Sequence, residues 1–178
     1  MKHAGVTLIE MLVVLMVIGI LAGLTTYINL DRPDFNRAGA DLLGTLQKAR
    51  FEAVRQNRPV VVNFVITGTA STVQAFVDLN DNGVKDYLDV DGNGLHDVGE
   101  LGDSALGGWT STEYRGAVSL SEAAFGGSLS QSFSWQPDGT PGTTTGSGGQ
   151  GRVVLVNRQG QRLAVSLSGA GLLSAGIP

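Results

Sequence analysis

The residues best suited to chemistry lie in two consecutive loops in the middle of the chain. Each loop follows a twelve-position calcium-binding pattern, in which oxygen-bearing side chains recur at positions 1, 3, 5, 9 and 12 and glycine permits a tight turn at position 6. Alternate side chains around such a turn converge on one centre, and position 7 offers its backbone carbonyl. The first loop would supply Asp78, Asn80, Asn82, Val84, Asp86 and Asp89. The second loop would supply Asp89, Asp91, Asn93, Leu95, Asp97 and Glu100.

These loops predict Ca2+ as the bound cofactor, because they offer hard oxygen ligands and the chain contains no cysteine. The first loop brings three carboxylates and the second brings four, so the second should bind more tightly. Asp89 belongs to both loops, and the pattern allows either one ion or two. No amphipathic helices flank the loops, which resemble the calcium loops of thrombospondin type 3 and dockerin repeats. The alternative is a solvated acidic loop rich in turn-forming residues.

Negative charge is concentrated in this part of the chain. The stretch from Asp78 to Asp103 holds eight acidic residues and one basic residue, Lys85, whereas the whole chain has a net charge of -4. Without a cation, the acidic residues of this stretch repel one another. We therefore expect the ion to act as a structural staple in a chain that cannot form a disulfide.

The loops need a domain to hold them, and the chain begins with a segment that could anchor that domain in a membrane. Positions 11–30 contain no charged residue and no histidine. As a helix, these positions would reach about 30 Å, which is the thickness of the hydrocarbon core of a bilayer. Glu10 is a solitary acid at the edge of this apolar run. An unpaired carboxylate in a membrane is costly, so Glu10 should meet a positive charge.

A pair of small residues, Ala4 and Gly5, follows the basic Lys2 and precedes the apolar segment. Proteolytic cleavage after this pair would therefore leave the apolar helix on the mature protein. Cleavage between Gly5 and Val6 would create an amine that could neutralise Glu10 on the same or a neighbouring copy. The run from Gly5 to Leu12 resembles the class III leader of type IV pilins and type II secretion pseudopilins. The resemblance implies cleavage by a prepilin peptidase and N-methylation of the first mature residue, which is usually Phe and is Val6 here. An ordinary anchor helix is the alternative.

A second helix should follow the anchor. Pro33 is expected to bend or restart the chain near 31–34, and apolar residues then recur at three-to-four spacing as far as Gln56. The predicted stripe of this amphipathic helix consists of Phe35, Ala38, Leu42, Leu43, Leu46, Ala49, Ala53 and Val54. The resulting division is a leader at 1–5, a transmembrane helix at 6–30, an amphipathic helix at 31–57 and a β-rich head at 58–178, with the calcium loops inserted at 78–103.

The head is predicted to consist of antiparallel strands, because β-branched runs alternate with turn signals. The expected strands cover residues 60–66, 72–77, 117–120, 132–135, 153–157 and 163–167. The first two and the last two should pair as hairpins, and the glycine-rich run 140–151 should be a mobile loop. One long helix packed on such a sheet gives an α+β fold.

A further resemblance narrows the family. The helix ends with Ala49, Arg50, Glu52 and Ala53, and a polar turn and a Pro-Val pair follow, which is similar to the GspH and FimT branch of minor pseudopilins. Later matches are Trp135 to Thr140, Arg152 to Asn157 and Arg162 to Leu167. The resemblance does not cover 78–103. It implies a pilin-like fold, no enzymatic activity, and assembly with other pilin or pseudopilin subunits.

The expected protein is therefore a minor subunit of a type IV pilus or a type II secretion pseudopilus. It would sit in the inner membrane as a single-pass protein and then join an extracytoplasmic filament, at the tip or in the shaft. The residues themselves give no enzyme site. His3 lies in the leader, His96 occupies position 8 of the second calcium loop, and the serines form no hydrolase motif.

The alternative function is that of a binding module at a filament tip, either an adhesin or a DNA-uptake receptor. The resembling family includes subunits implicated in DNA uptake, which carry basic residues near the C-terminus. Here residues 166–178 contain no Arg or Lys, and the late cations are Arg152, Arg158 and Arg162. Because binding to the DNA backbone needs clustered cations, nucleic acid is not the expected partner.

Overall fold

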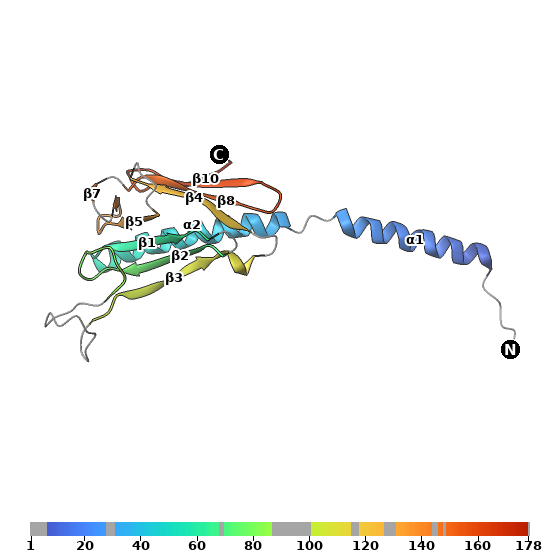
Figure 1. The fold of residues 1–178 in the computed structure, drawn as a ribbon, viewed down its shortest axis with the longest axis horizontal. Coiled ribbons are helices and arrows are strands. Elements are labelled where there is room, and N and C mark those ends of the chain that lie inside the picture. Colours follow the sequence, from blue (N-terminus) through green and yellow to red (C-terminus); the bar gives the residue numbers. More distant parts are fainter. Residues whose placement is uncertain are drawn as a thin grey trace.

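One helix, α2, forms the axis of the head, and two antiparallel sheets fold against it (Figure 1). The structure is a computed structural model. It describes residues 7–27, 31–67, 70–86, 101–114, 118–126, 131–143, 146–147 and 149–177.

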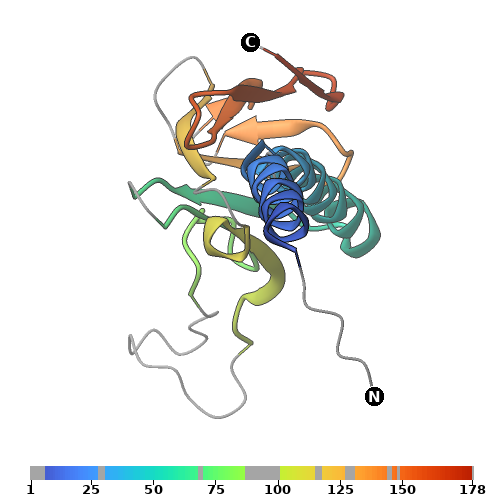
Figure 2. The same ribbon diagram turned by 90° about the vertical axis from the view of Figure 1, so that its right-hand side faces the viewer.

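The N-terminal part of the chain contains two helices. α1 spans Leu8–Tyr27 and α2 spans Asp31–Gln56. Pro33 lies in the first turn of α2, where its missing N–H has no intrahelical partner to lose. α1 extends away from the head in roughly the direction of α2 (Figures 1 and 2). Among the described residues, no helix meets the length and apolarity required of a membrane span.

The first sheet has the strand order β3-β2-β1-β5-β6-β7, and all neighbours are antiparallel. Its strands are β1 (Val60–Val65), β2 (Thr72–Val77), β3 (Ser104–Thr110), β5 (Ser132–Trp135), β6 (Pro141–Thr143) and β7 (Gly146–Ser147). The pairing of β2 with β3 contains a bulge between Ala75 and Phe76. Gly108 lies so close to β2 that an added Cβ would stand 2.3 Å from the carbonyl oxygen of Val73. Only glycine therefore fits there.

The second sheet has the strand order β10-β9-β8-β4 and is also antiparallel. Its strands are β4 (Ser119–Phe125), β8 (Gly151–Val156), β9 (Arg162–Leu167) and β10 (Leu173–Gly176). A short 3-10 helix, η1 (Ser111–Glu113), follows β3. Figure 2 shows α2 beside the opening between the two sheets, where its apolar stripe completes the core.

Aromatic side chains join the two sheets at the centre of the core. The ring of Phe125 on β4 lies 5.2 Å from that of Phe64 on β1 and 4.7 Å from that of Phe133 on β5. Trp135 meets Phe133 edge to face at 5.4 Å. Such aromatic pairs contribute about 0.5–1.5 kcal/mol beyond their buried area. The second sheet is therefore held to the first by side chains rather than by backbone pairing.

The structure confirms the predicted α+β fold of N-terminal helices and an antiparallel sheet domain. Both predicted hairpins form, β1 with β2 and β8 with β9. The prediction was wrong in four places. Neither β3 nor β10 was expected, β4 runs on to Phe125 instead of ending at Leu120, and the run 140–151 contains β6 and β7 instead of being only a loop. These segments are rich in Gly, Ser and Ala and lack a clear alternation of apolar and polar residues. Their pairing is therefore set by the neighbouring strands of the sheet.

The prediction that Val54 belongs to the buried apolar stripe of the helix was wrong. Val54 is 52% exposed, whereas Ala49 and Ala53 are buried. Val54 lies at the border of the stripe, where its Cγ2 would be 3.4 Å from a Cβ added at Gly139.

Candidate functional site

The described part of the first predicted calcium loop, residues 78–86, is organised by Asp78, which follows the last residue of β2. Only 1% of its surface is exposed. Its Oδ1 accepts the backbone N–H of Asn82 at 3.3 Å, and its Oδ2 accepts that of Gly83 at 2.7 Å. Gly83 has a φ of 76°, a left-handed conformation that favours glycine. The carboxylate at position 1 of the pattern thus faces the turn at position 6.

Three further oxygen-bearing side chains meet in the same loop. Nδ2 of Asn80 donates to Oδ1 of Asp86 at 3.1 Å, and Nδ2 of Asn82 donates to Oδ2 of Asp86 at 2.6 Å. The Oδ1 atoms of the two asparagines accept backbone N–H groups of Asn82 and Val84, at 3.3 and 2.7 Å. Each amide oxygen keeps a second lone pair. The structure thus brings Asp78, Asn80, Asn82 and Asp86 together.

Asp103 ties the two ends of the acidic stretch together. Its Oδ1 accepts the N–H of Leu79 and its Oδ2 accepts the N–H of Asp86, both at 3.0 Å. The N–H of Asp103 donates to the carbonyl of Asp86 at 2.9 Å. The calcium pattern does not single out Asp103. In the sequence, Asp103 is marked only as the last acid of the stretch that begins at Asp78.

The remaining predicted ligands lie outside the described residues. They are Asp89, Asp91, Asn93, Leu95, Asp97 and Glu100. Within the described ranges, no group of three or more His, Cys, Asp or Glu side chains is arranged to hold a metal ion.

The predicted cleavage site, Gly5 and Val6, also lies outside the described residues. Glu10 lies in the first turn of α1, where its N–H donates to Oγ1 of Thr7 at 3.3 Å and to the carbonyl of Thr7 at 3.0 Å. Thr7 therefore caps the helix. Glu10 is exposed and forms no ion pair with the residues that the structure describes.

The motif at the end of α2 meets the late motif around Trp135. The guanidinium of Arg50 lies over the Trp135 ring, 5.5 Å from its centroid, and Nη1 of Arg50 donates to the carbonyl of Gly171 at 2.8 Å. Gly139, with a φ of 79°, leaves only 3.2 Å between an added Cβ and Nε of Arg50. Arg50 thus fastens α2 to β5 and to the turn between β9 and β10. The sequence motif contains Arg50 but does not reveal partners so distant along the chain.

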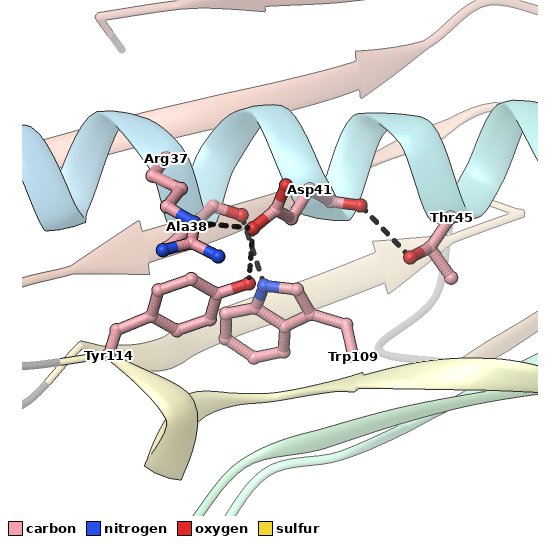
Figure 3. A network of polar contacts seen from close by, with 6 residues as sticks. All are labelled: Arg37, Ala38, Asp41, Thr45, Trp109 and Tyr114. Carbon is pink, nitrogen blue, oxygen red and sulfur yellow. Dashed lines mark hydrogen bonds and ion pairs between the residues drawn. The ribbon is translucent and has the colours of Figure 1, made fainter.

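A polar network joins the first half of α2 to β3 and η1 (Figure 3). Nε1 of Trp109 donates to the carbonyl of Ala38 at 3.0 Å, and the hydroxyl of Tyr114 donates to Oδ2 of Asp41 at 2.9 Å. Nε of Arg37 lies 3.5 Å from the same carboxylate oxygen. Burial, together with the hydrogen bond to Asp41, raises the pKa of Tyr114 well above its usual range. Both aromatic residues are buried, and they hold β3 against the helix.

The three late arginines do not form one cluster. Arg152 pairs with Glu122, and the distance from Nη2 to Oε1 is 3.1 Å. Arg158 and Arg162 flank the opposite end of the same hairpin and are exposed. Of the three late arginines, two therefore form no ion pair with a residue that the structure describes.

An exposed apolar helix that leads into a helix packed on antiparallel sheets is the architecture of pilin-like subunits. A family model described as the prokaryotic N-terminal methylation motif matches residues 1–26. A second family model, described as type II transport protein GspH, matches residues 38–171. Because the second match spans more than half of the chain, the chain belongs to the GspH family.

Comparison with solved structures gives two matches. The minor pseudopilin EpsH from the type 2 secretion system of Vibrio cholerae is 11% identical, with a TM-score of 0.50, over 82% of this chain and 98% of that one. The type IV minor pilin FimU of Pseudomonas aeruginosa is 16% identical, with a TM-score of 0.49, over 82% of this chain and 90% of that one. No curated protein matches in sequence. The family is one of pilin-like structural subunits, which confirms the prediction of a non-enzymatic protein.

Proposed function

We propose that the chain is a membrane-anchored subunit of a filament, either a type IV pilus or a type II secretion pseudopilus. A prepilin peptidase cleaves between Gly5 and Val6, and Val6 becomes the N-methylated first residue. Segment 6–30 then holds the subunit in the inner membrane until it joins other subunits in an extracytoplasmic filament. The match of residues 1–26 to the N-terminal methylation motif supports this processing.

The exposure of α1 is the observation that carries the proposal. Its large apolar side chains between Leu8 and Leu21 are all at least 47% exposed. Burying one such side chain stabilises a protein by about 1.5–3 kcal/mol relative to leaving it in water. A helix with this surface therefore requires an apolar environment outside its own fold. Lipid supplies that environment before assembly, and the helices of neighbouring subunits supply it afterwards.

We assign Glu10 a role in assembly, because it is the acid among these exposed apolar side chains. The amine of Val6, on the same or a neighbouring copy, is the proposed counter-charge. Glu10→Gln should leave membrane insertion intact and reduce incorporation into filaments. Asp34→Asn removes an acid outside segment 6–30 and is the matched control, which should assemble normally.

Mass spectrometry of the mature protein tests the processing step. The mature chain should begin at Val6, and Gly5→Leu should retain the leader. A mature N-terminus at any other residue would contradict the proposal.

The proposal includes calcium bound in the acidic stretch as a structural staple. Three side chains of the first loop meet at Asp86, and the buried carboxylate of Asp78 accepts backbone N–H groups of the same loop. A cation there would neutralise Asp86, to which two uncharged asparagine amides now donate. Binding to the folded state alone stabilises a protein by about 2.7 kcal/mol at a hundredfold excess of ligand over Kd.

An adhesin or DNA-uptake role at a filament tip stays a prediction of the sequence. A tip subunit should be recovered at low stoichiometry, and its deletion should remove adhesion or DNA uptake while the major subunit still polymerises. Equal loss of the filament would instead indicate a role in assembly.

A further inference from the structure

The turn between β8 and β9 lies at the end of the head from which α1 extends (Figure 1). A hollow of about 260 Å³ at this end is lined by Phe35, Asn36, Gln161, Arg162, Leu163 and Ile177. Phe35 is near the start of α2, and it lines this hollow together with Gln161 and Arg162 of the turn. The turn therefore lies beside the N-terminal end of α2.

This position is close to the lipid surface if α1 is a membrane anchor, so the inference rests on the proposed function. Phe35 lies eight positions after Tyr27, the last residue of α1, and eight positions of a helix would rise about 12 Å. The headgroup layer adds about 5–7 Å on each side of the hydrocarbon core. Long arginine side chains at the level of Phe35 therefore reach the headgroup layer.

The charge of the turn is available for an external partner. Arg158 and Arg162 are both exposed, and neither forms an ion pair with any residue that the structure describes. By contrast, Arg37 pairs with Asp41, and Arg152 pairs with Glu122 at the other end of the hairpin. Within the β8–β9 hairpin, the arginines that form no ion pair with a described residue are thus the two at the turn.

The turn is also held in one conformation. Asn157 is 5% exposed, and its Oδ1 accepts the N–H groups of Gln159 and Gln161 at 3.1 and 2.9 Å. Its Nδ2 donates to Oε1 of Gln161 at 2.9 Å. Gly160 completes the turn with a φ of 76°. Little conformational freedom is therefore left to lose when the turn binds a partner.

We propose that Arg158 and Arg162 bind the phosphates of anionic lipids while the subunit is still in the membrane. Ile177, which is 91% exposed, lines the same hollow as Arg162 and can meet the apolar edge of the headgroup layer. This combination favours a lipid surface over DNA, because DNA binding relies on neutralising several phosphates along a groove. Contact at this turn would set the tilt of the head before assembly.

Full-length protein in lipid vesicles provides the test. The chain has no cysteine, so Ala175→Cys places a single fluorophore on β10 near the turn, and Ala170→Cys places one at the opposite end of β10. Quenching by a lipid with a spin-labelled headgroup is compared between phosphatidylcholine vesicles and vesicles that also contain phosphatidylglycerol. The label at Ala175 should be quenched more strongly in the anionic vesicles, and the label at Ala170 should not.

Matched variants decide whether charge at the turn is responsible. Each arginine near an anionic surface raises the equilibrium constant for contact between the turn and the lipid by about fivefold. The double variant Arg158→Ala, Arg162→Ala should therefore lower this constant by about thirtyfold and abolish the anionic increment, which is the extra quenching seen in anionic vesicles. The double change to Lys should keep the increment. Arg152→Ala, on the same hairpin, should also keep it. An increment that is absent in the parent protein, or unchanged in the double Ala variant, overturns the inference.

Two further readouts separate the possible failures. If alkaline extraction removes the protein from both kinds of vesicle, the membrane anchor itself is refuted. If the protein resists extraction but lipid charge has no effect, only the lipid contact is refuted. A short DNA duplex that binds the detergent-solubilised protein through Arg158 and Arg162, without any lipid increment, would identify the turn as a nucleic-acid contact and overturn the inference.

Discussion

The turn after Asp78 and the turn after Asn157 lie at opposite ends of α2 and share a hydrogen-bond arrangement, but they differ in chemistry. In each, a buried side chain directly after a strand accepts backbone N–H groups of the following turn. Asp78 follows β2 and accepts from Asn82 and Gly83, whereas Asn157 follows β8 and accepts from residues 159 and 161. The length of α2, about 39 Å, separates the two ends.

The difference lies in what the buried side chain can still do. The amide of Asn157 donates as well as accepts, so it also bonds the side chains of the turn and carries no charge. The carboxylate of Asp78 only accepts, and it sits in a stretch with a strong excess of acids. The β8–β9 turn therefore needs no ion to complete its hydrogen bonds. The acidic loop has hydrogen bonds of the same kind, and in the proposed function calcium neutralises its excess negative charge.

The largest expected effect comes from Asp78→Ala. The change leaves the N–H of Gly83 without its acceptor and takes one of two acceptors from the N–H of Asn82, which costs about 1–3 kcal/mol, and it removes the first ligand of the proposed ion. We expect a loss of roughly 2–4 kcal/mol in millimolar calcium and a smaller loss in chelator, measured by urea unfolding. Asp81→Asn removes a charge of the same loop from a position that is not a ligand, and it should have little effect in either buffer. Equal losses for Asp78→Ala in both buffers would remove calcium from the explanation.

Asn157→Ala should be the next most harmful change. It removes the acceptor of two N–H groups in the β8–β9 turn, so we expect a loss of about 1–3 kcal/mol. Because this turn needs no ion, the loss should be the same with calcium and with chelator. A calcium-dependent loss would show that the two ends of the head are not independent.

Tyr114→Phe tests a contact that belongs to neither turn, and a loss of about 0.5–1.5 kcal/mol is expected from the missing hydrogen bond to Asp41. A tyrosine with a raised pKa in the folded state contributes stability that is present below its ordinary pKa of about 10 and is lost as the pH rises. The parent protein should therefore lose stability above that pH more steeply than the variant does. Parallel alkaline profiles in thermal melts would contradict this assignment.

The smallest expected effect concerns the exposed turn between β5 and β6. The pKa of Asp138 is lowered by hydrogen bonds from the hydroxyl and the N–H of Thr140, at 2.7 and 2.8 Å. Its contribution is present above the ordinary pKa of Asp and is lost as the pH falls. Thr140→Ala should raise the pKa of Asp138 in an NMR titration and change the melting temperature little. An unchanged pKa would show that the hydroxyl is not the main cause.

How far the sequence predicts these regions depends on the range of the interactions. The register of the first calcium loop and both hairpins follow from residues a few positions apart, and the fold reproduces the hairpins. The partners of Trp109 and Arg50 lie 71 and 121 positions away, and no local pattern indicates them. β3 was missed because its Gly107-Gly108 pair breaks any alternation of apolar and polar residues, so that the strand depends on β2 for its pairing.

A calcium titration of the full-length protein in detergent micelles tests the contrast between the two turns most directly. Calorimetry should show saturable heat at millimolar calcium or below, and the protein should melt several degrees higher in calcium than in chelator. Glu100→Ala should erase more of that difference than Asp78→Ala, because the second loop has more carboxylates, and Asp89→Ala should weaken both sites. No heat of binding, together with an unchanged melting temperature in chelator, would contradict the calcium staple and leave only an acidic loop.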